Sequence, residues 1–344
     1  KPLSPHRMEE GNPIDAAGGE AMEKTLVNAV FEGGGVKGIS LAGAVRAAEM
    51  NGVRFHRVAG TSSGSIVAAL LATGYNATEM KEIIETTPFR SFMQRAPIFN
   101  MQIVGPALRL LLKKGLYAGN ALEQWVSGLL AAKGVRTFGD LPPGKVRIIA
   151  SDITNGKLLV LPDDIAEYGI DPARFPVARA IRMSTSIPYF FDPVVLRQPL
   201  RARKASEESK QGIKFSYVVD GGLLSNFPLW LFESEASEAN PIPVIGFQMV
   251  GKAEAKRHRI TGPFTMFQAM FETMLGAHDE RYIEEQKWVR TIRIPTMGVG
   301  TTQFDLKPEQ SASLYEAGLT AGQKFFKQWD CHTGKRRTAI QPKL

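Results

Sequence analysis

Cysteine is almost absent from this chain of 344 residues, since Cys331 is the only one. A disulfide within the chain is therefore excluded, and the composition fits a reducing compartment, so we expect a cytoplasmic protein. Cys331 lies in the polar stretch QWDCHTGKRR, which offers no strand or helix to hold a thiolate nucleophile. We expect its role to be incidental.

Long apolar runs are absent as well. No run approaches the roughly 20 apolar residues that span a bilayer, and residues 1–24 lack the apolar core of a secretory signal. Hydrophobic residues still make up 44% of the chain, enough for a large buried core. We expect a polar N-terminal tail at 1–24, one folded domain at 25–330 and a basic tail at 331–344.

Acidic residues are in the minority, because 42 Lys and Arg against 34 Asp and Glu give a formal charge of +8. A positive charge favours anionic partners. The basic residues occur in short clusters without interleaved aromatic residues, at 113–114, 201–204, 256–259 and 335–337. This pattern argues against nucleic-acid recognition. It leaves two interpretations, solvated loops or a surface that contacts anionic membrane lipid.

Strand-like apolar runs alternate with helical periodicity, and no internal repeat divides the chain, which is typical of an α/β layer fold. Asn76 with Glu79, and Asn120 with Glu123, predict the N-caps of two helices. The expected strands are 25–33, 55–60, 215–220 and 243–250, with a hairpin over 145–162; the other expected helices are 38–52, 63–74, 176–187, around 264–289 and 308–329.

The stretch GTSSG, from Gly60 to Gly64, matches the G-x-S-x-G pattern of a nucleophile elbow. In such an elbow a serine, here Ser62, sits on a sharp turn between a strand and a helix, and the glycines relieve the crowding. The helix start also places free N–H groups near any anion formed there. The pattern alone leaves a second interpretation open, in which Ser62 only caps a buried helix.

A second motif, FEGGGVKG, follows the first expected strand and opens the first expected helix. Consecutive glycines allow backbone N–H groups to converge on an anion. A Walker loop is excluded because Ile39 follows Gly38, and the literal dinucleotide pattern lacks an acidic residue about 20 positions further on. We therefore favour an oxyanion formed at Ser62 as the occupant. A nucleotide-binding module stays open as an alternative.

A third motif, DGGLLSNFP, begins at Asp220, directly after an expected strand. Asp220 with Gly221 and Gly222 fits either an ordinary turn or a carboxylate placed at the sheet edge where the serine lies. A carboxylate can serve as a general base if desolvation raises its pKa.

Taken together, the three motifs resemble the patatin-like phospholipase family, in its bacterial members. Similar segments at 134–142, 178–194 and 304–322 extend the resemblance over about residues 25 to 330. The resemblance implies a three-layer α/β/α fold with a central, mostly parallel sheet, and 25–330 as the catalytic domain. It also implies hydrolysis of fatty-acyl esters of phospholipids or lysophospholipids through an acyl-enzyme.

Carried over to this sequence, the resemblance implies that Ser62 is the nucleophile and Asp220 the sole general base. It assigns the oxyanion hole to the loop that contains Gly33, Gly34, Gly35 and Gly38, with Lys37 fixing that loop. No cofactor is implied. No group of His, Cys and carboxylate residues has metal-ligand spacing, so we expect no metal.

Histidine provides the alternative mechanism. His258 and His278 both follow Asp220 in the sequence, so a Ser-Asp-His triad in an esterase of small soluble esters stays open, with His278 the better candidate.

The segment 92–115 is rich in apolar residues and ends in Lys113 and Lys114. It predicts either a mobile lid or interfacial helix, or an ordinary pair of core helices. The expected partners are a phospholipid or lysophospholipid substrate and, peripherally, the anionic inner face of the membrane. Bacterial members of the family include regulated effectors, so a small-molecule or protein activator is a further expected partner.

Overall fold

The computed structural model describes residues 25–93, 114–197, 215–232, 242–251, 260–262, 265–267, 269–274, 290–330 and 335–336. Within these ranges, no helix is long and apolar enough to cross a membrane.

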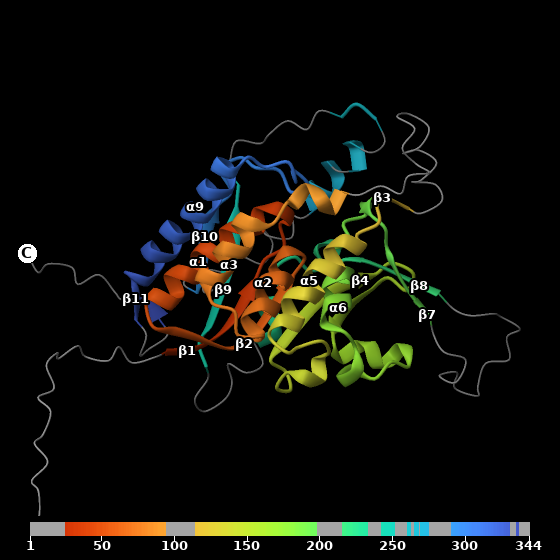
Figure 1. Ribbon diagram of the computed structural model, residues 1–344, viewed down its shortest axis with the longest axis horizontal. Helices are drawn as coiled ribbons and strands as arrows, with labels where there is room; N and C mark the ends of the chain where they lie inside the picture. Colours follow the sequence, from red (N-terminus) through yellow and green to blue (C-terminus); the bar gives the residue numbers. More distant parts are fainter. Residues whose placement is uncertain are drawn as a thin grey trace, which may run out of the picture.

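The fold is built on an eight-stranded sheet in the order β10-β9-β1-β2-β4-β8-β7, with β5 paired to β4 (Figure 1). The pairs from β10 to β4 are parallel, whereas β8, β7 and β5 join in antiparallel orientation. This confirms the predicted central, mostly parallel sheet. The strands are β1 (Thr25–Phe31), β2 (Val53–Thr61), β4 (Val146–Asp152), β5 (Lys157–Leu161), β7 (Val194–Arg197), β8 (Phe215–Asp220), β9 (Val244–Val250) and β10 (Thr291–Pro295).

Helices flank the sheet, as predicted from the alternating pattern (Figure 1). They are α1 (Ile39–Met50), α2 (Ser63–Ala72), α3 (Ala77–Thr86), α5 (Asn120–Ala132), α6 (Val177–Ser184) and α9 (Pro308–Phe326). Helices α1 and α9 cross closely, because a Cβ added to Gly318 would lie 1.8 Å from the Ser40 carbonyl oxygen. Glycine at this crossing therefore lets the two backbones approach.

The two faces of the sheet have different partners. Alternate residues of a strand point to opposite faces, so Phe31 and Val58 pack with the helices, whereas Val30 and Ala59 pack on the other side. That second side is covered by the short helix η9 (Leu229–Phe232). Both faces of the central part of the sheet are therefore buried.

The helix starts test two sequence predictions. At α3, Asn76 and Glu79 form the predicted capping box. At α5 the prediction was wrong, because Gly119 rather than Asn120 occupies the N-cap position and no side chain caps the helix. Gly119 has a φ of 70°, and a Cβ there would lie 2.4 Å from the Arg182 guanidinium. Packing against Arg182 thus sets this helix start.

Two small sheets accompany the main one. A small antiparallel pair joins β11 (Trp329–Asp330) to β12 (Lys335–Arg336). A second small sheet pairs β3 (Gly115–Tyr117) with β6 (Tyr189–Phe191) beside the main sheet.

The register of the sheet brings the three sequence motifs together. Phe31 of β1 pairs with Gly60 of β2, and Gly60 pairs with Ile148 of β4. Asp220, the last residue of β8, pairs with Ala150. The glycine loop, the GTSSG turn and Asp220 therefore meet at one edge of the sheet.

Candidate active site

The turn from β2 into α2 has the geometry of a nucleophile elbow. Ser62 has φ 52° and ψ −125°, a conformation that is strained for any residue other than glycine. A Cβ added to Gly60 would lie 2.3 Å from the Gly64 carbonyl oxygen, and one added to Gly64 would lie 2.3 Å from the Phe31 carbonyl oxygen. Both glycines are thus required by the closeness of the surrounding backbone.

A direct hydrogen bond links the two polar residues of the site. The Ser62 hydroxyl donates to Asp220 Oδ2 at 2.7 Å, and Asp220 Oδ1 accepts from the Gly222 amide at 2.8 Å. Both side chains are buried, with 4% of Ser62 and 2% of Asp220 exposed. Burial raises the pKa of Asp220 to about 7, although the hydrogen bonds from Ser62 and Gly222 act in the opposite direction. The carboxyl is therefore a stronger base than an exposed aspartate.

The last residue of α6 and the segment that follows it hold Ser62 and Asp220 by their backbones. Ser184 Oγ accepts from the Ser62 N–H at 2.8 Å, and the Asp220 N–H donates to the Ser186 carbonyl at 2.9 Å. Ser186 is held in turn by Arg182, which hydrogen-bonds its hydroxyl and donates to the carbonyls of Ala118 and Asp192 at 2.7 Å. Burial lowers the pKa of Arg182 to about 10, so the guanidinium is still charged at neutral pH.

The glycine loop divides its three amides between different partners. The Gly33 N–H donates to the Asn226 carbonyl at 3.1 Å, and the Gly34 N–H donates to Ser63 Oγ at 3.1 Å. The Gly35 N–H makes no hydrogen bond to any residue that the structure describes. Of the three predicted oxyanion donors, Gly35 is thus the one whose amide is available to a ligand in this conformation.

Contacts from both sides fix this loop. Gly35 has a φ of 57°, and a Cβ there would lie 2.0 Å from the Thr301 carbonyl oxygen. The same carbonyl accepts from the Val36 N–H at 3.1 Å. On the elbow side, a Cβ added to Gly38 would lie 2.6 Å from Ser63 Cβ, so the loop and α2 are in direct contact. Lys37 lies against Gly34, with its Cε 3.3 Å from the place of a Gly34 Cβ.

A buried polar pair clamps the loop start. Asn226 Nδ2 donates to the Gly33 carbonyl at 3.1 Å and to Glu32 Oε1 at 3.4 Å. The other Glu32 carboxylate oxygen accepts from the Met249 N–H. The roles of Asn226, Glu32 and Ser184 were not anticipated from the sequence. The available signal was a single acidic residue after the apolar strand in AVFEGGG, and polar residues beside recognised motifs in DGGLLSNFP and RMSTSIP.

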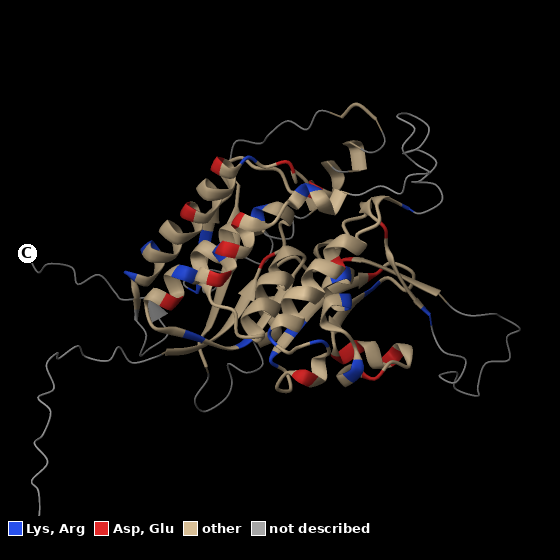
Figure 2. Cartoon of the chain, viewed as in Figure 1, with Lys and Arg blue, Asp and Glu red and all other residues tan. Residues whose placement is uncertain are grey.

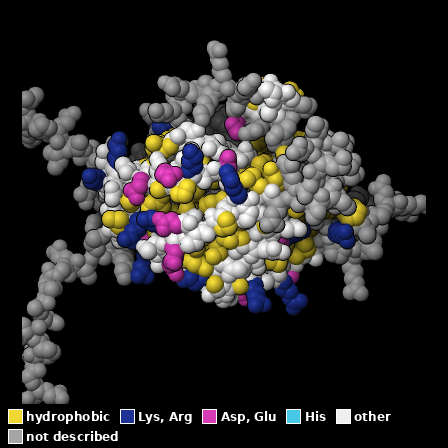
Figure 3. All heavy atoms as spheres, turned by 45° about the horizontal axis from the view of Figure 1, so that its top comes forward, with side chains coloured by type: hydrophobic (Ala, Val, Ile, Leu, Met, Phe, Trp, Pro, Cys, Tyr) yellow, Lys and Arg dark blue, Asp and Glu magenta, His cyan; other side chains and the backbone are white. Residues whose placement is uncertain are grey.

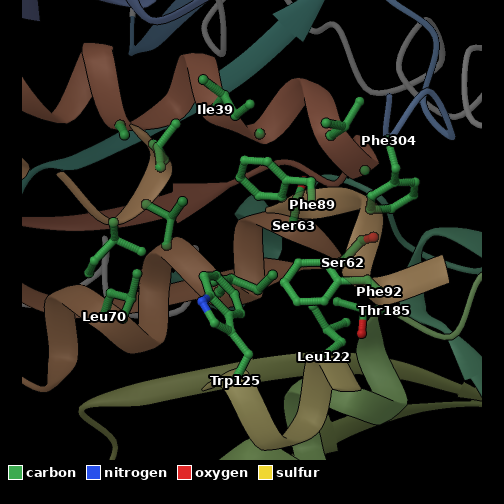
Figure 4. Close-up of a pocket in the computed structure, with 18 of the residues that line it drawn as sticks. Ile39, Ser62, Ser63, Leu70, Phe89, Phe92, Leu122, Trp125, Thr185 and Phe304 are labelled. Carbon is green, nitrogen blue, oxygen red and sulfur yellow. The ribbon is translucent and has the colours of Figure 1, made fainter. Parts of the chain in front are cut away.

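An apolar cavity of about 100 Å³ opens beside Ser62 (Figure 4). Most of its wall comes from α1, α2, α3, α5 and the short helix η2 (Phe89–Met93), and the rest from the glycine loop, β6 and non-helical segments. Apart from the reacting end, the side chains are aliphatic or aromatic; they include Ile39, Ala42, Ile66, Val67, Leu70, Met80, Ile83, Ile84, Phe89, Phe92, Leu122, Trp125, Ile187, Phe191 and Phe304. Such a cavity suits a hydrocarbon chain and offers no partner for a polar one.

Several predictions lie wholly or partly outside the described residues. His258, His278, the clusters at 201–204 and 256–259, and residues 94–113 of the predicted lid fall there. At the described edge of that segment, Phe92 lines the cavity and is 3% exposed. Within the described ranges, no three His, Cys, Asp or Glu side chains gather as a metal site would require.

Charge is distributed without one dominant sign on the visible faces. Figure 2 shows Lys and Arg interspersed with Asp and Glu along the helices, and Figure 3 shows the same mixture among hydrophobic surface atoms. Contact with an anionic surface therefore stays a prediction.

A serine hydroxyl that donates to a buried carboxylate at one edge of a mixed α/β sheet is an arrangement suited to nucleophilic catalysis, and comparison with known proteins identifies the family. The family model for patatin-like phospholipases matches residues 29–232. "Uncharacterized protein YqhO" of Bacillus subtilis (strain 168) is 44% identical over 308 residues, covering 88% of this chain and 99% of that protein. "Probable lipid hydrolase 463L" of Invertebrate iridescent virus 6 is 25% identical over 235 residues, covering 64% of this chain and 66% of that protein.

The chain therefore belongs to the patatin-like phospholipase family, and this membership supports lipid acyl hydrolase activity. Among solved structures, VipD from Legionella pneumophila aligns with a TM-score of 0.49 and 16% identity, over 88% of this chain and 66% of VipD. The type III effector ExoU aligns with a TM-score of 0.44 and 15% identity, over 88% of this chain and 53% of ExoU. The chain thus spans only part of either protein.

Proposed function

We propose that this protein is a phospholipase A or lysophospholipase that cleaves fatty-acyl esters of membrane lipids through Ser62 and Asp220. The observation that carries the proposal is the direct hydrogen bond from the Ser62 hydroxyl to a buried carboxylate, at the entrance of an apolar cavity. A serine hydroxyl becomes an effective nucleophile when an adjacent base takes its proton. The cavity supplies a place for the acyl chain of the same substrate.

In the acylation step, Asp220 accepts the Ser62 proton while Oγ attacks the ester carbonyl carbon. The carbonyl oxygen becomes an oxyanion. When the tetrahedral intermediate collapses, the ester C–O bond breaks and the alcohol leaves with the proton from Asp220. The products of this step are a free alcohol and an acyl-enzyme on Ser62. Because the Asp220 pKa is about 7, the carboxyl is able to accept and return a proton near neutral pH.

In the deacylation step, water replaces the alcohol. Asp220 takes a proton from the attacking water, a second tetrahedral intermediate forms, and the Ser62 oxygen leaves with that proton. The fatty acid is released and the starting state of the site is restored.

Backbone amides near Ser62 support a place for the oxyanion. The Gly35 N–H is unengaged among the described residues, and the Ser63 N–H belongs to the first turn of α2, where amides lack intrahelical partners. We assign the oxyanion to these two donors, and each such donor lowers the activation barrier by about 3 kcal/mol. In this assignment Gly33, Gly34 and Gly38 shape the loop.

The alternative with a Ser-Asp-His triad requires an imidazole between the hydroxyl and the carboxylate. A direct Ser62–Asp220 contact of 2.7 Å leaves no room for one, which favours the dyad. Replacement of His278 tests this alternative, because a triad member is essential and a bystander is not.

Contact with a membrane is part of the proposal. Phe271, in the helical stretch 269–274, packs into the aromatic cluster around Phe92 and Leu122, which also line the cavity. Beside it, Met266 and Met270 are 49% and 60% exposed. We propose that Met266 and Met270 face the acyl region of a cytoplasmic membrane surface, with the basic clusters favouring anionic lipid.

Dependence on a small-molecule or protein activator is tested by adding cell extract.

The experiment measures fatty-acid release from vesicles of mixed anionic phospholipid and lysophospholipid. Ser62→Ala and Asp220→Asn are expected to lower release by at least about 10⁴-fold, while His278→Ala retains it. The rate should rise with pH and level off above about 7, since the base must be ionised.

Each outcome has a distinct meaning. Loss of release in a folded His278→Ala variant would establish a triad and overturn the dyad. If the wild type releases nothing, even with cell extract, labelling of Ser62 by a fluorophosphonate separates a wrong substrate class from an inert serine. An inert serine would overturn the proposal itself.

A further inference from the structure

We infer that the cavity accepts a single acyl chain and that Met80 and Ala42, at its closed end, set the length of chain that the protein accepts. This inference rests on the proposed hydrolysis at Ser62 and deepens it, because it identifies the acyl chain as the part of the substrate that is selected and names two residues that select its length.

Helix α2 gives the cavity a direction. Ser62, Ser63, Ile66, Val67 and Leu70 all line it, and this spacing places them along one face of the helix. Ser62 and Leu70 are eight positions apart in the sequence, which corresponds to about 12 Å along a helix axis. Figure 4 shows Ser62 and Leu70 at opposite sides of the cavity. A chain attached at Ser62 therefore extends along α2 toward Leu70.

Helix α3 closes the far end. Only residues 73–76 separate α2 from α3, and Leu70 in the last turn of α2 and Met80 in the first turns of α3 both line the cavity. The Tyr75 N–H donates to the Leu70 carbonyl at 3.0 Å, which holds this connection against the helix end. Met80 is 1% exposed and Leu70 is 5% exposed. With so little of either side chain exposed, this part of the cavity wall is closed to solvent.

Helix α1 supplies the smallest side chain of the far wall. Ala42 lines the cavity and is 1% exposed, one turn beyond Ile39, which also lines it. A larger residue at 42 would project into the space that the acyl chain uses. A smaller residue at position 80 should thus lengthen the cavity, whereas a larger residue at position 42 should shorten it.

The volume argues for one chain. A cavity of about 100 Å³ with mostly apolar walls is too small for two hydrocarbon chains side by side, so the second chain of a diacyl lipid has to remain outside. Each methylene that finds room in an apolar site improves affinity by about fourfold. Affinity should therefore rise with chain length until the far wall is reached and then stop rising.

The first test measures binding and needs no catalysis. Straight-chain fatty acids from hexanoate to hexadecanoate are titrated, below their micelle concentrations, into the Ser62→Ala protein and followed by calorimetry. The additional change Met80→Ala should move the chain length at which affinity stops rising to a longer acid, and raise the long-to-short affinity ratio by at least about tenfold. Ala42→Leu should move it to a shorter acid.

The matched control is Met183→Ala. Met183 is fully buried in α6 and does not line the cavity, so this variant loses the same side chain from a core site and should have a comparable loss of thermal stability. Its chain-length profile should equal that of the parent. A profile that is unchanged in both cavity variants, or changed equally by Met183→Ala, overturns the inference.

A second readout separates this inference from the proposed function. Hydrolysis of p-nitrophenyl esters from butyrate to palmitate is measured with the same three changes in the catalytically intact protein. Hydrolysis whose length preference ignores Met80 and Ala42 overturns the inference and leaves the hydrolase proposal standing. Fatty-acid binding that depends on Met80, without hydrolysis of any ester or lipid, overturns the hydrolase proposal and retains the length-setting cavity.

Discussion

The two ends of helix α2 are built on opposite principles. At its N-terminus, Ser62 is strained and polar, and lies beside a buried carboxylate. At its C-terminus, Leu70 lies among buried aliphatic side chains without strain or charge. Strain and burial of a charge both lower the stability of the folded chain, whereas apolar burial raises it. The comparison teaches that the reactive end of the helix is held in place by packing at the other end and by the surrounding backbone.

Among three variants that probe this comparison beyond the loss of catalysis in Ser62→Ala and Asp220→Asn, the largest effect is expected for Gly35→Ala. The new Cβ would lie 2.0 Å from the Thr301 carbonyl oxygen, at a φ of 57°. The loop has to shift, so an oxyanion donor is displaced and kcat should fall by about 10² to 10³-fold. The control is Gly128→Ala in α5, where an added Cβ meets nothing within 4 Å. That variant should keep full activity and gain roughly 0.5–1 kcal/mol of stability. Equal kinetics for both variants would remove Gly35 from the mechanism.

A smaller effect is expected for Asp220→Asn, which should raise the stability of the folded protein. The pKa of Asp220 is about 7 in the folded protein, against about 3.9 in an unfolded chain. The protonated carboxyl thus contributes stability that is fully present below about pH 4 and is lost as the pH rises through about 7. Asparagine stays neutral throughout. The variant should therefore gain roughly 2–3 kcal/mol over the wild type between pH 5 and pH 8.

Chemical denaturation at several pH values measures this difference. If the difference in the free energy of unfolding between Asp220→Asn and wild type does not change with pH, burial of the ionised carboxylate does not lower the stability at this end of α2.

The smallest effect is expected for Ser184→Ala. This change removes the acceptor of the Ser62 N–H and leaves that buried amide unpaired, which costs roughly 1–2 kcal/mol. If the bond positions Ser62, kcat should fall about tenfold with little change in KM, and Ser184→Thr should restore it because the hydroxyl is kept. Ser216→Ala, a buried serine of β8 that does not contact Ser62, is the control and should leave kcat unchanged. A matching loss in both variants would mean a general loss of stability.

The sequence predicted the parts of the site that depend on local rules. The elbow at Ser62 requires small neighbours two positions away, and Asn76 with Glu79 is a local capping pair, so both were visible in a few residues. The strand order could be inferred only as a class, because alternation of strands and helices does not specify which strands are antiparallel. The family resemblance supplied the pairing of Ser62 with Asp220, which are 158 positions apart.

Features that depend on long-range packing could not be predicted. The start of α5 is set by Arg182, which lies 63 positions from Gly119, so the local pattern at Asn120 pointed to the wrong residue. The division of the glycine amides depends on Asn226 and on Ser63, and no spacing within FEGGG reveals which amide is left for a ligand. The cavity has the same origin, since its walls come from separate helices whose apolar residues resemble ordinary core positions.

The shared role of α2 has a consequence for how such a protein can change its substrate. The helix carries both the reacting oxygen and one wall of the cavity, so one inserted residue would rotate the wall by about 100° relative to Ser62. Insertions or deletions in α2 therefore change the cavity wall and the position of the nucleophile together. Helices α1 and α3 have no such constraint at Ala42 and Met80. Divergence among related proteins in the lipids they accept should be concentrated at those two positions, while the face of α2 remains the same.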